Sequence, residues 1–324
     1  MNACTHSCDP SPDMEEVWKH SLIRVTDEFT LPPVVLRVDD AIIGTLGNFS
    51  VSTGKAKAKK TFNVCALVAA ALTNGQVLEY RASFPETKRN ILYFDTEQSP
   101  YHCQLVMQRI LCLAELPLDR EPEHLHFSHL RAIAEPEIRR AIIRYAIYHT
   151  PDVGLVIIDG IRDLMLDINN STEATRLVGD LMKWTGERNI HLHTVLHLNK
   201  GDNNTQGHTG TELNNKGECA LQVTKDSTNS DRSVVASAII RSKPFDKFAF
   251  RLKEQAGGIC LPEVHATYVE DTKTAKYFLY QELTDEQDRE ALKETLGEDN
   301  VLSYGDPIPR LRSSYHVIIS LEYG

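Results

Sequence analysis

The feature that most limits the possible folds is a regular alternation of short apolar runs with segments of helical periodicity. Residues 153–159 (VGLVIID) are apolar until the last position, which is typical of a strand covered on both faces. Residues 90–95 (NILYFD) repeat this pattern, and residues 171–188 have the spacing of an amphipathic helix. Because strands buried on both faces need helices on both sides, the sequence predicts an α/β fold with a mainly parallel sheet.

The expected elements divide the chain into three parts. We predict a flexible N-terminal segment over residues 1–30, an α/β domain over 31–283 and a small helical segment over 284–324. Residues 34–38 are expected to be extended, and strands of the parallel sheet are expected at 47–53, 90–95, 124–127, 153–159 and 190–196. The helices that flank this sheet are expected at 60–73, 101–113, 135–149 and 171–188. An antiparallel extension of the sheet is expected from strands at 219–225, 233–240, 248–252 and 276–280.

The overall charge bears on the class of partner. The net charge of the 324-residue chain is -10 at pH 7, whereas domains that bind nucleic acid are often basic. We therefore expect nucleic-acid binding only through local basic loops within an acidic body.

The cysteines and the apolar runs bear on the compartment. The seven cysteines are scattered and odd in number, which favours a reduced, cytoplasmic chain. No apolar run approaches the length of a membrane span, so no membrane partner is expected. Cys4, His6 and Cys8 are residue types that bind metals, but no second ligand pair follows them, and we expect a disordered terminus there.

Residues 54–61 (GKAKAKKT) lie between an expected strand and an expected helix and resemble a phosphate-binding loop. The pattern of such loops is G-x-x-x-x-G-K-[ST], with the lysine on the β- and γ-phosphates and the hydroxyl group on Mg²⁺. Gly54 takes the place of the first glycine, Lys60 that of the lysine and Thr61 that of the magnesium ligand. The remaining residues expected around a bound ATP are Lys55, Ala56, Lys57, Ala58, Lys59 and Phe62.

Lys59 departs from this pattern, because it stands in the place of the second glycine. A side chain there is expected to crowd the phosphate cradle and to add positive charge. ATP binding with slow or absent turnover is therefore one hypothesis. The alternative interpretation of the whole segment is a basic surface turn in front of a helix.

Two acidic residues follow expected strands at the edge where α/β sheets bind ligands. Glu97 is the candidate base that orients the attacking water, with a helix-capping role as the alternative. Asp159 ends the most apolar strand and is the candidate second magnesium ligand. A buried strand also ends in aspartate for purely structural reasons, so that alternative stays open.

Three later segments complete the set of candidates. His197 ends an expected strand and is a candidate sensor of the γ-phosphate, or else a structural histidine. Residues 201–210 (GDNNTQGHTG) predict a loop, either disordered or in contact with a nucleic-acid strand. Arg241 and Lys243 are expected on one face of a strand, where they act on a neighbour's nucleotide or protect an exposed sheet edge.

The order of these motifs resembles the RecA superfamily. The loop, the strands that bear Glu97 and Asp159, the run 197–200 (HLNK) and the segment 239–250 (IIRSKPFDKFAF) are similar to the RepA-like hexameric helicase and ATPase group of plasmids and mobilisable elements. The resemblance covers about residues 34–252. It implies a RecA-like fold, ATP and Mg²⁺ at the interfaces of a ring or hexamer, and single-stranded DNA in a central channel.

The resemblance leads to one main functional hypothesis and two alternatives. The main hypothesis is an ATP-dependent motor or switch that acts on DNA during replication or transfer of a mobile element. The first alternative is a nucleotide-binding regulatory or assembly protein with a degenerate loop that does not hydrolyse ATP. The second is a RecA-like kinase domain of the signalling type.

Overall fold

The computed structural model describes residues 13–167, 170–197, 207–226, 229, 231–255 and 258–264. All of these belong to one compact unit, Met1–Ala266. Several sequence predictions lie outside the described residues. They are the cluster Cys4, His6 and Cys8, residues 198–206, the strand at 276–280 and the helical segment at 284–324.

Among the described residues, the main sheet has nine strands in the order β13-β12-β11-β10-β3-β9-β8-β6-β7. Its parallel part runs from β10 to β7. It comprises β10 (Cys219–Lys225), β3 (Phe49–Gly54), β9 (His191–His197), β8 (Val153–Asp159), β6 (Asn90–Asp95) and β7 (Leu125–His129). The antiparallel strands are β11 (Arg232–Ile240), β12 (Phe248–Glu254) and β13 (Cys260–Val264). The predicted α/β class, with a RecA-like, mainly parallel sheet and an antiparallel extension, is confirmed.

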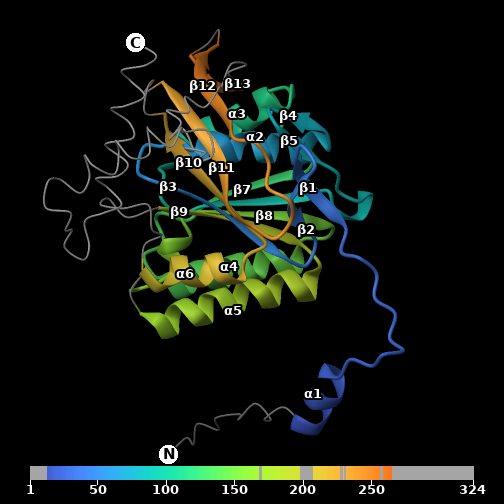
Figure 1. The fold of residues 1–324 in the computed structure, drawn as a ribbon. Coiled ribbons are helices and arrows are strands. Elements are labelled where there is room, and N and C mark those ends of the chain that lie inside the picture. The colour runs from blue at the N-terminus through green and yellow to red at the C-terminus, as the bar shows by residue number, and fades with distance from the viewer. Residues whose placement is uncertain are drawn as a thin grey trace, which may run out of the picture. The chain divides into compact units, whose positions relative to one another are not determined.

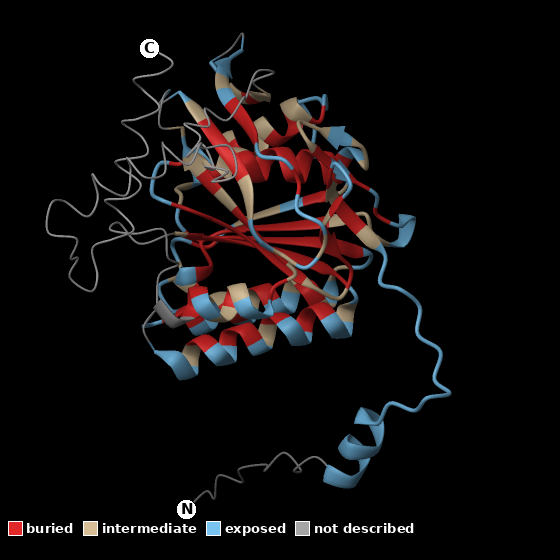
Figure 2. Ribbon diagram, in the orientation of Figure 1, coloured by how far each residue is buried: buried red, intermediate tan, exposed pale blue. Residues whose placement is uncertain are grey.

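Helices cover both faces of this sheet (Figure 1). On one face lie α2 (Lys60–Thr73) and α3 (Pro100–Leu113), and on the other α4 (Pro136–His149), α5 (Ser171–Arg188) and α6 (Gly207–Lys216). Figure 2 shows the buried strands between these two helical layers. The apolar side chains form one cluster on each face, and this explains why β8 is buried over its full length.

A second, four-stranded sheet has the order β2-β1-β5-β4. Its strands are β1 (Val34–Val38), β2 (Ala41–Thr45), β4 (Gln76–Val77) and β5 (Tyr80–Ala82), of which the sequence predicted only β1. Short 3-10 helices lie at η1 (Glu86–Lys88) and η2 (Ile161–Leu164). The segment predicted to be flexible contains α1 (Met14–Ser21), a helix without a buried residue.

Two local predictions are wrong. Residues 207–210, expected in a loop, form the first turn of α6. β11 ends at Ile240, so Arg241 and Lys243 lie in the turn after the strand and not on one of its faces. β11 pairs with β12 over Arg232–Val235 and not over the half of the strand that precedes Arg241, so the alternative that the two cations protect an exposed sheet edge stays open.

Candidate functional site

The loop at residues 54–61 connects β3 to α2, as a phosphate-binding loop does. Gly54 ends β3 beside β10, and a Cβ atom there would lie 2.3 Å from the carbonyl oxygen of Val223, so only glycine fits. The N-cap residue of α2, Lys59, makes no side-chain cap hydrogen bond. Within the described part of the chain, the first N–H groups of this helix therefore lack a capping side chain at the position where helices bind phosphate.

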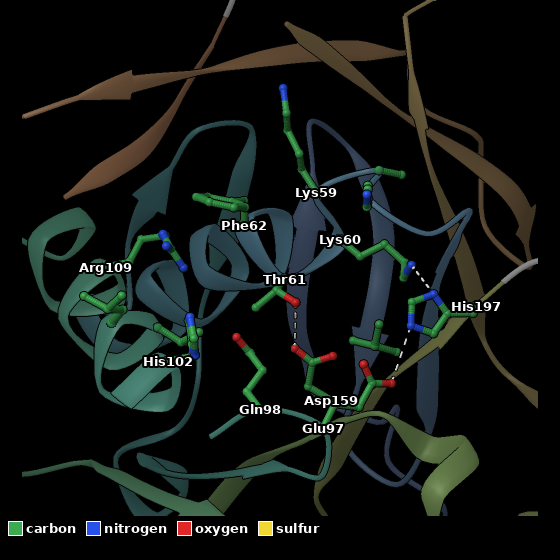
Figure 3. Close-up of a pocket in the computed structure, with 15 residues that line it drawn as sticks. Lys59, Lys60, Thr61, Phe62, Glu97, Gln98, His102, Arg109, Asp159 and His197 are labelled. Carbon is green, nitrogen blue, oxygen red and sulfur yellow. Dashed lines mark hydrogen bonds and ion pairs between the residues drawn. The ribbon is translucent and has the colours of Figure 1, made fainter. Parts of the chain in front are cut away.

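Lys59 adopts the left-handed conformation, with φ of 67° and ψ of 32°. Glycine is favoured there, and this accounts for the glycine in the usual pattern. Its side chain points away from Thr61 (Figure 3), and its Nζ donates to the carbonyl oxygen of Asp231 at 2.6 Å. The side chain does not fill the space between Lys60 and Thr61, so the expected crowding is not observed.

Lys60 is buried and directs its ammonium group into the loop. Its Nζ donates to the carbonyl oxygens of Gly54 at 2.9 Å and Lys55 at 3.2 Å, and to Nδ1 of His197 at 2.9 Å. Burial lowers the pKa of Lys60 to about 8, against the opposing effects of Asp159 and Glu97. The loop therefore holds a cation at the position where phosphate groups would need one.

Thr61 and Asp159, the two residues predicted to bind magnesium, lie in direct contact. The hydroxyl group of Thr61 donates to Oδ2 of Asp159 at 2.9 Å, and the hydroxyl group of Tyr93 donates to the same oxygen at 3.0 Å. Burial and the nearby Asp95 raise the pKa of Asp159 to about 6. The two hydroxyl groups oppose this shift, because they stabilise the charged carboxylate.

Glu97 and His197 face each other across the loop end of the sheet. Nε2 of His197 lies 3.4 Å from Oε1 of Glu97. Because Lys60 can only donate, Nδ1 of His197 must accept, which places the imidazole proton on Nε2 toward Glu97. This hydrogen bond is the main reason why the pKa of Glu97 is lowered.

The turn that presents Glu97 is built by Asp95. The buried carboxylate of Asp95 accepts hydrogen bonds from the backbone N–H groups of Glu97 and Gln98. Ser99, and not Glu97, is the N-cap residue of α3. The helix-capping alternative for Glu97 is therefore wrong, and its side chain is free to face the cavity.

A cavity of about 350 Å³ joins these groups (Figure 3). Of the predicted site residues, those that line it are Lys57, Ala58, Lys59, Lys60, Thr61, Phe62, Glu97, Asp159 and His197. The end opposite His197 offers Phe62, His102 and Arg109, with the guanidinium carbon 3.9 Å from the centre of the Phe62 ring. One end of the cavity thus offers Lys60 and two carboxylates, and the other end offers an aromatic ring with a second cation, Arg109.

Arg241 and Lys243 lie away from this cavity. Ile240 is opposite Cys219, which is opposite Ser50, so the turn after β11 lies at the amino end of β3. Gly54 is at the carboxyl end of the same strand. Both cations are exposed, and they lie at the opposite end of the strands from the loop of their own chain.

Sequence reasoning missed four residues that shape the site, namely Tyr93, Gln98, His102 and Arg109. Tyr93 stands three positions before Thr96 in an apolar strand and reads as a core residue. The fold brings it to Asp159 through the β6–β8 pairing, in which Asp95 is opposite Asp159. The sequence of β6 alone does not show that β8 is its neighbour or how the two strands are aligned, and without this register the contact between Tyr93 and Asp159 could not be predicted.

No helix among the described residues is both long and apolar enough to cross a membrane. A search of curated proteins found no match. A family model described as an AAA domain (AAA_25) matches residues 24–203, more than half of the chain. The match spans the nucleotide loop and the strands that carry Glu97, Asp159 and His197, and ends before β10. The chain therefore belongs to this AAA domain family and is a nucleotide-binding protein of the P-loop ATPase type.

Proposed function

We propose that the protein binds and hydrolyses ATP as a RecA-like, RepA-like motor or switch that acts on DNA of a mobile genetic element. The observation that carries the ATPase part is the convergence of Lys60, Thr61, Asp159, Glu97 and His197 on one cavity. Phosphoryl transfer depends on positioning and on charge stabilisation, and these residues supply both.

Each residue has a chemical role that follows from its contacts. Lys60 and the uncapped start of α2 would bind the phosphate oxygens. Thr61 and Asp159 offer two oxygen ligands, which suits Mg²⁺, a cation that neutralises the charge of phosphate oxygens. Glu97 would orient water, and its lowered pKa keeps it charged. His197 contacts both Lys60 and Glu97 and is suited to sense what occupies the space between them.

The conformation of Lys59 favours turnover over the non-hydrolysing alternative. That alternative rested on crowding of the cradle, and the side chain is directed outward to Asp231. Lys59→Gly is therefore expected to leave the affinity for ATP and the rate of hydrolysis within about threefold of wild type, which corresponds to less than roughly 1 kcal/mol.

The DNA and oligomer parts of the proposal rest on the resemblance to the RepA-like group. The exposed Arg241 and Lys243, on the edge away from their own loop, support a role at a neighbour's nucleotide. In a head-to-tail ring each chain would offer its loop to one neighbour and this turn to the other.

Phosphate release, measured with and without single-stranded DNA, tests the proposal. We expect turnover that DNA stimulates, that Lys60→Ala abolishes and that Lys59→Gly retains. Turnover that survives Lys60→Ala would contradict the assignment of the loop. A large gain of turnover in Lys59→Gly would favour the non-hydrolysing alternative for the natural chain.

A further inference from the structure

A chain of polar side chains lies buried between β3 and β9. The hydroxyl group of Ser50 lies 2.8 Å from Nε2 of His191 and 2.7 Å from Nδ1 of His193. The hydroxyl group of Ser52 lies 2.8 Å from Nε2 of His193. All four side chains are almost inaccessible to solvent. Ser52 is two residues before Gly54, so one end of the chain is next to the nucleotide loop.

The direction of every hydrogen bond in this chain of side chains follows from the contact between His191 and Thr45, at the end far from the nucleotide loop. Nδ1 of His191 contacts the carbonyl oxygen of Thr45 at 3.0 Å, and a carbonyl oxygen can only accept. Both imidazoles are neutral at pH 7, because burial lowers the pKa of His191 to about 4 and that of His193 to about 3. Nε2 of His191 must then accept from Ser50, Ser50 must accept from His193, and His193 must accept from Ser52.

Thr45 connects this series of buried side chains to Glu218. The backbone N–H group of Thr45 donates to Oε2 of Glu218 at 2.8 Å, and its hydroxyl group contacts both carboxylate oxygens at 3.0 and 3.1 Å. The backbone of Glu218 also forms hydrogen bonds. Its N–H group donates to the carbonyl oxygen of Phe49 at 2.8 Å, at the start of β3.

The carbonyl oxygen of Glu218 accepts the backbone N–H group of Arg241 at 3.1 Å. The guanidinium group of Arg241 donates to the carbonyl oxygen of Lys216, at the end of α6. The hydroxyl group of Ser242 contacts the backbone of Ile42. The turn that carries the two exposed cations is thus held at three points, and Glu218 connects one of them to β3.

We propose that Glu218 is a positioning residue that holds the turn of Arg241 and Lys243 in register with the strand of the nucleotide loop. Its carboxylate binds Thr45, whose carbonyl oxygen contacts the buried His–Ser chain, while its backbone binds Phe49 and Arg241. This inference rests on the proposed function, in which the two cations act on a neighbour's nucleotide. Loss of the carboxylate leaves the backbone hydrogen bond to Arg241 in place but removes the side-chain anchor that holds this backbone carbonyl group in position, without touching the cavity.

The position of Arg241 can be tested without any turnover. In Glu218→Ala we expect the amide hydrogen exchange of Arg241 to accelerate about tenfold, because loss of the hydrogen bonds from Thr45 to the carboxylate weakens the local structure that holds the carbonyl acceptor of this N–H. Glu218→Gln retains an acceptor for Thr45 and should stay near wild type. Glu254→Ala, at an exposed glutamate of β12, is the matched control. Unchanged exchange at Arg241 in Glu218→Ala overturns the inference, whatever the turnover.

Oligomers mixed from two variants distinguish a role of Glu218 in positioning the turn from a general loss of folding. A Lys60→Ala chain has a defective loop and an intact turn, whereas a Glu218→Ala chain has the reverse. Equal mixing should restore about a quarter of wild-type turnover, because random assembly pairs an intact loop with an intact turn at about one interface in four. No recovery on mixing would contradict positioning. Absence of turnover in the wild-type chain would instead refute the proposed function, and the exchange experiment would still decide the role of Glu218.

Discussion

Oδ2 of Asp159 accepts two hydroxyl groups, one from the expected magnesium ligand Thr61 and one from Tyr93. The ring of Tyr93 is fully buried and stacks on Phe127 with the ring centres 4.4 Å apart. Packing thus fixes the position of the hydroxyl group, and the hydroxyl group fixes the orientation of the carboxylate. At the scale of single residues, the geometry of the proposed magnesium ligands Thr61 and Asp159 thus depends on Tyr93, a side chain outside the proposed ligand set.

Tyr93→Phe removes this hydroxyl group and retains the ring. We expect the Mg²⁺ concentration needed for half-maximal ATP turnover to rise by roughly tenfold, as is typical when a partner of a metal ligand is lost. A magnesium titration of phosphate release measures the effect.

Tyr80→Phe is a matched control, because Tyr80 is also fully buried and donates to Asn63, away from Asp159. It removes the same atom from the same kind of environment and should leave the magnesium dependence unchanged. An equal shift in both variants would assign the effect to stability and not to Asp159.

At the scale of elements, the pairing of β3 with β9 depends on two buried neutral imidazoles. Burial lowers the pKa of His191 to about 4 and that of His193 to about 3, from an ordinary value of 6.5. The unfolded chain therefore binds more protons than the folded chain below pH 6.5. The free energy of unfolding is retained above pH 6.5 and falls as the pH drops toward 4.

The depressed pKa of His191 corresponds to roughly 3 kcal/mol of stability lost over this range. Urea unfolding at pH 7.5 and at a series of lower values, down to about pH 4.5, measures it. His193→Gln should be less stable at neutral pH but lose less stability on acidification. His149→Gln, at the exposed end of α4, controls for the loss of a histidine. An unaltered pH slope in His193→Gln would contradict the assignment.

The close packing of β2 against β9 also requires a glycine at position 44. A Cβ atom on Gly44 would lie 2.8 Å from Nε2 of the buried His191. Gly44→Ala should therefore lower the free energy of unfolding by about 1–3 kcal/mol, the usual cost of an overpacked core. Gly179→Ala adds the same atom to α5, where nothing lies within 4 Å, and should raise stability by up to about 1 kcal/mol. Equal effects of both substitutions on urea unfolding would refute the packing argument.

The sequence revealed those elements whose pattern is set by burial on both faces. β6, β8 and α2 have the predicted bounds because unbroken apolar runs and helical spacing leave few alternatives. β4 and β5 are too short to show such a pattern. β11 ends where its pairing with β10 ends, and the sequence of β11 alone does not indicate where β10 begins. Because apolar runs mark strand ends, Asp159 was recognised at the end of a strand and Glu97 just past one, while Tyr93 required the cross-strand register.

At the scale of the whole molecule, the two sets of candidate groups lie at opposite ends of β3. The loop follows Gly54, whereas Arg241 and Lys243 lie beyond Cys219 and Ser50 at the amino end. A single chain cannot bring both sets to one nucleotide without unfolding the sheet between them. Neighbouring copies in a head-to-tail arrangement meet this requirement, since each interface then joins a loop to a turn.

This separation predicts a specific pattern for the double variant Arg241→Ala, Lys243→Ala. Binding of a fluorescent ATP analogue to dilute protein should remain within about twofold of wild type, because the cavity of the same chain is intact. Turnover at concentrations that allow assembly should fall by about 10³-fold or more, as for the loss of a cation supplied in trans. Light scattering with ATP and Mg²⁺ would show whether the variant still assembles. Unchanged turnover in an assembled variant would refute the role in trans, while a parallel loss of ATP affinity in dilute protein would place the two cations at their own chain's nucleotide.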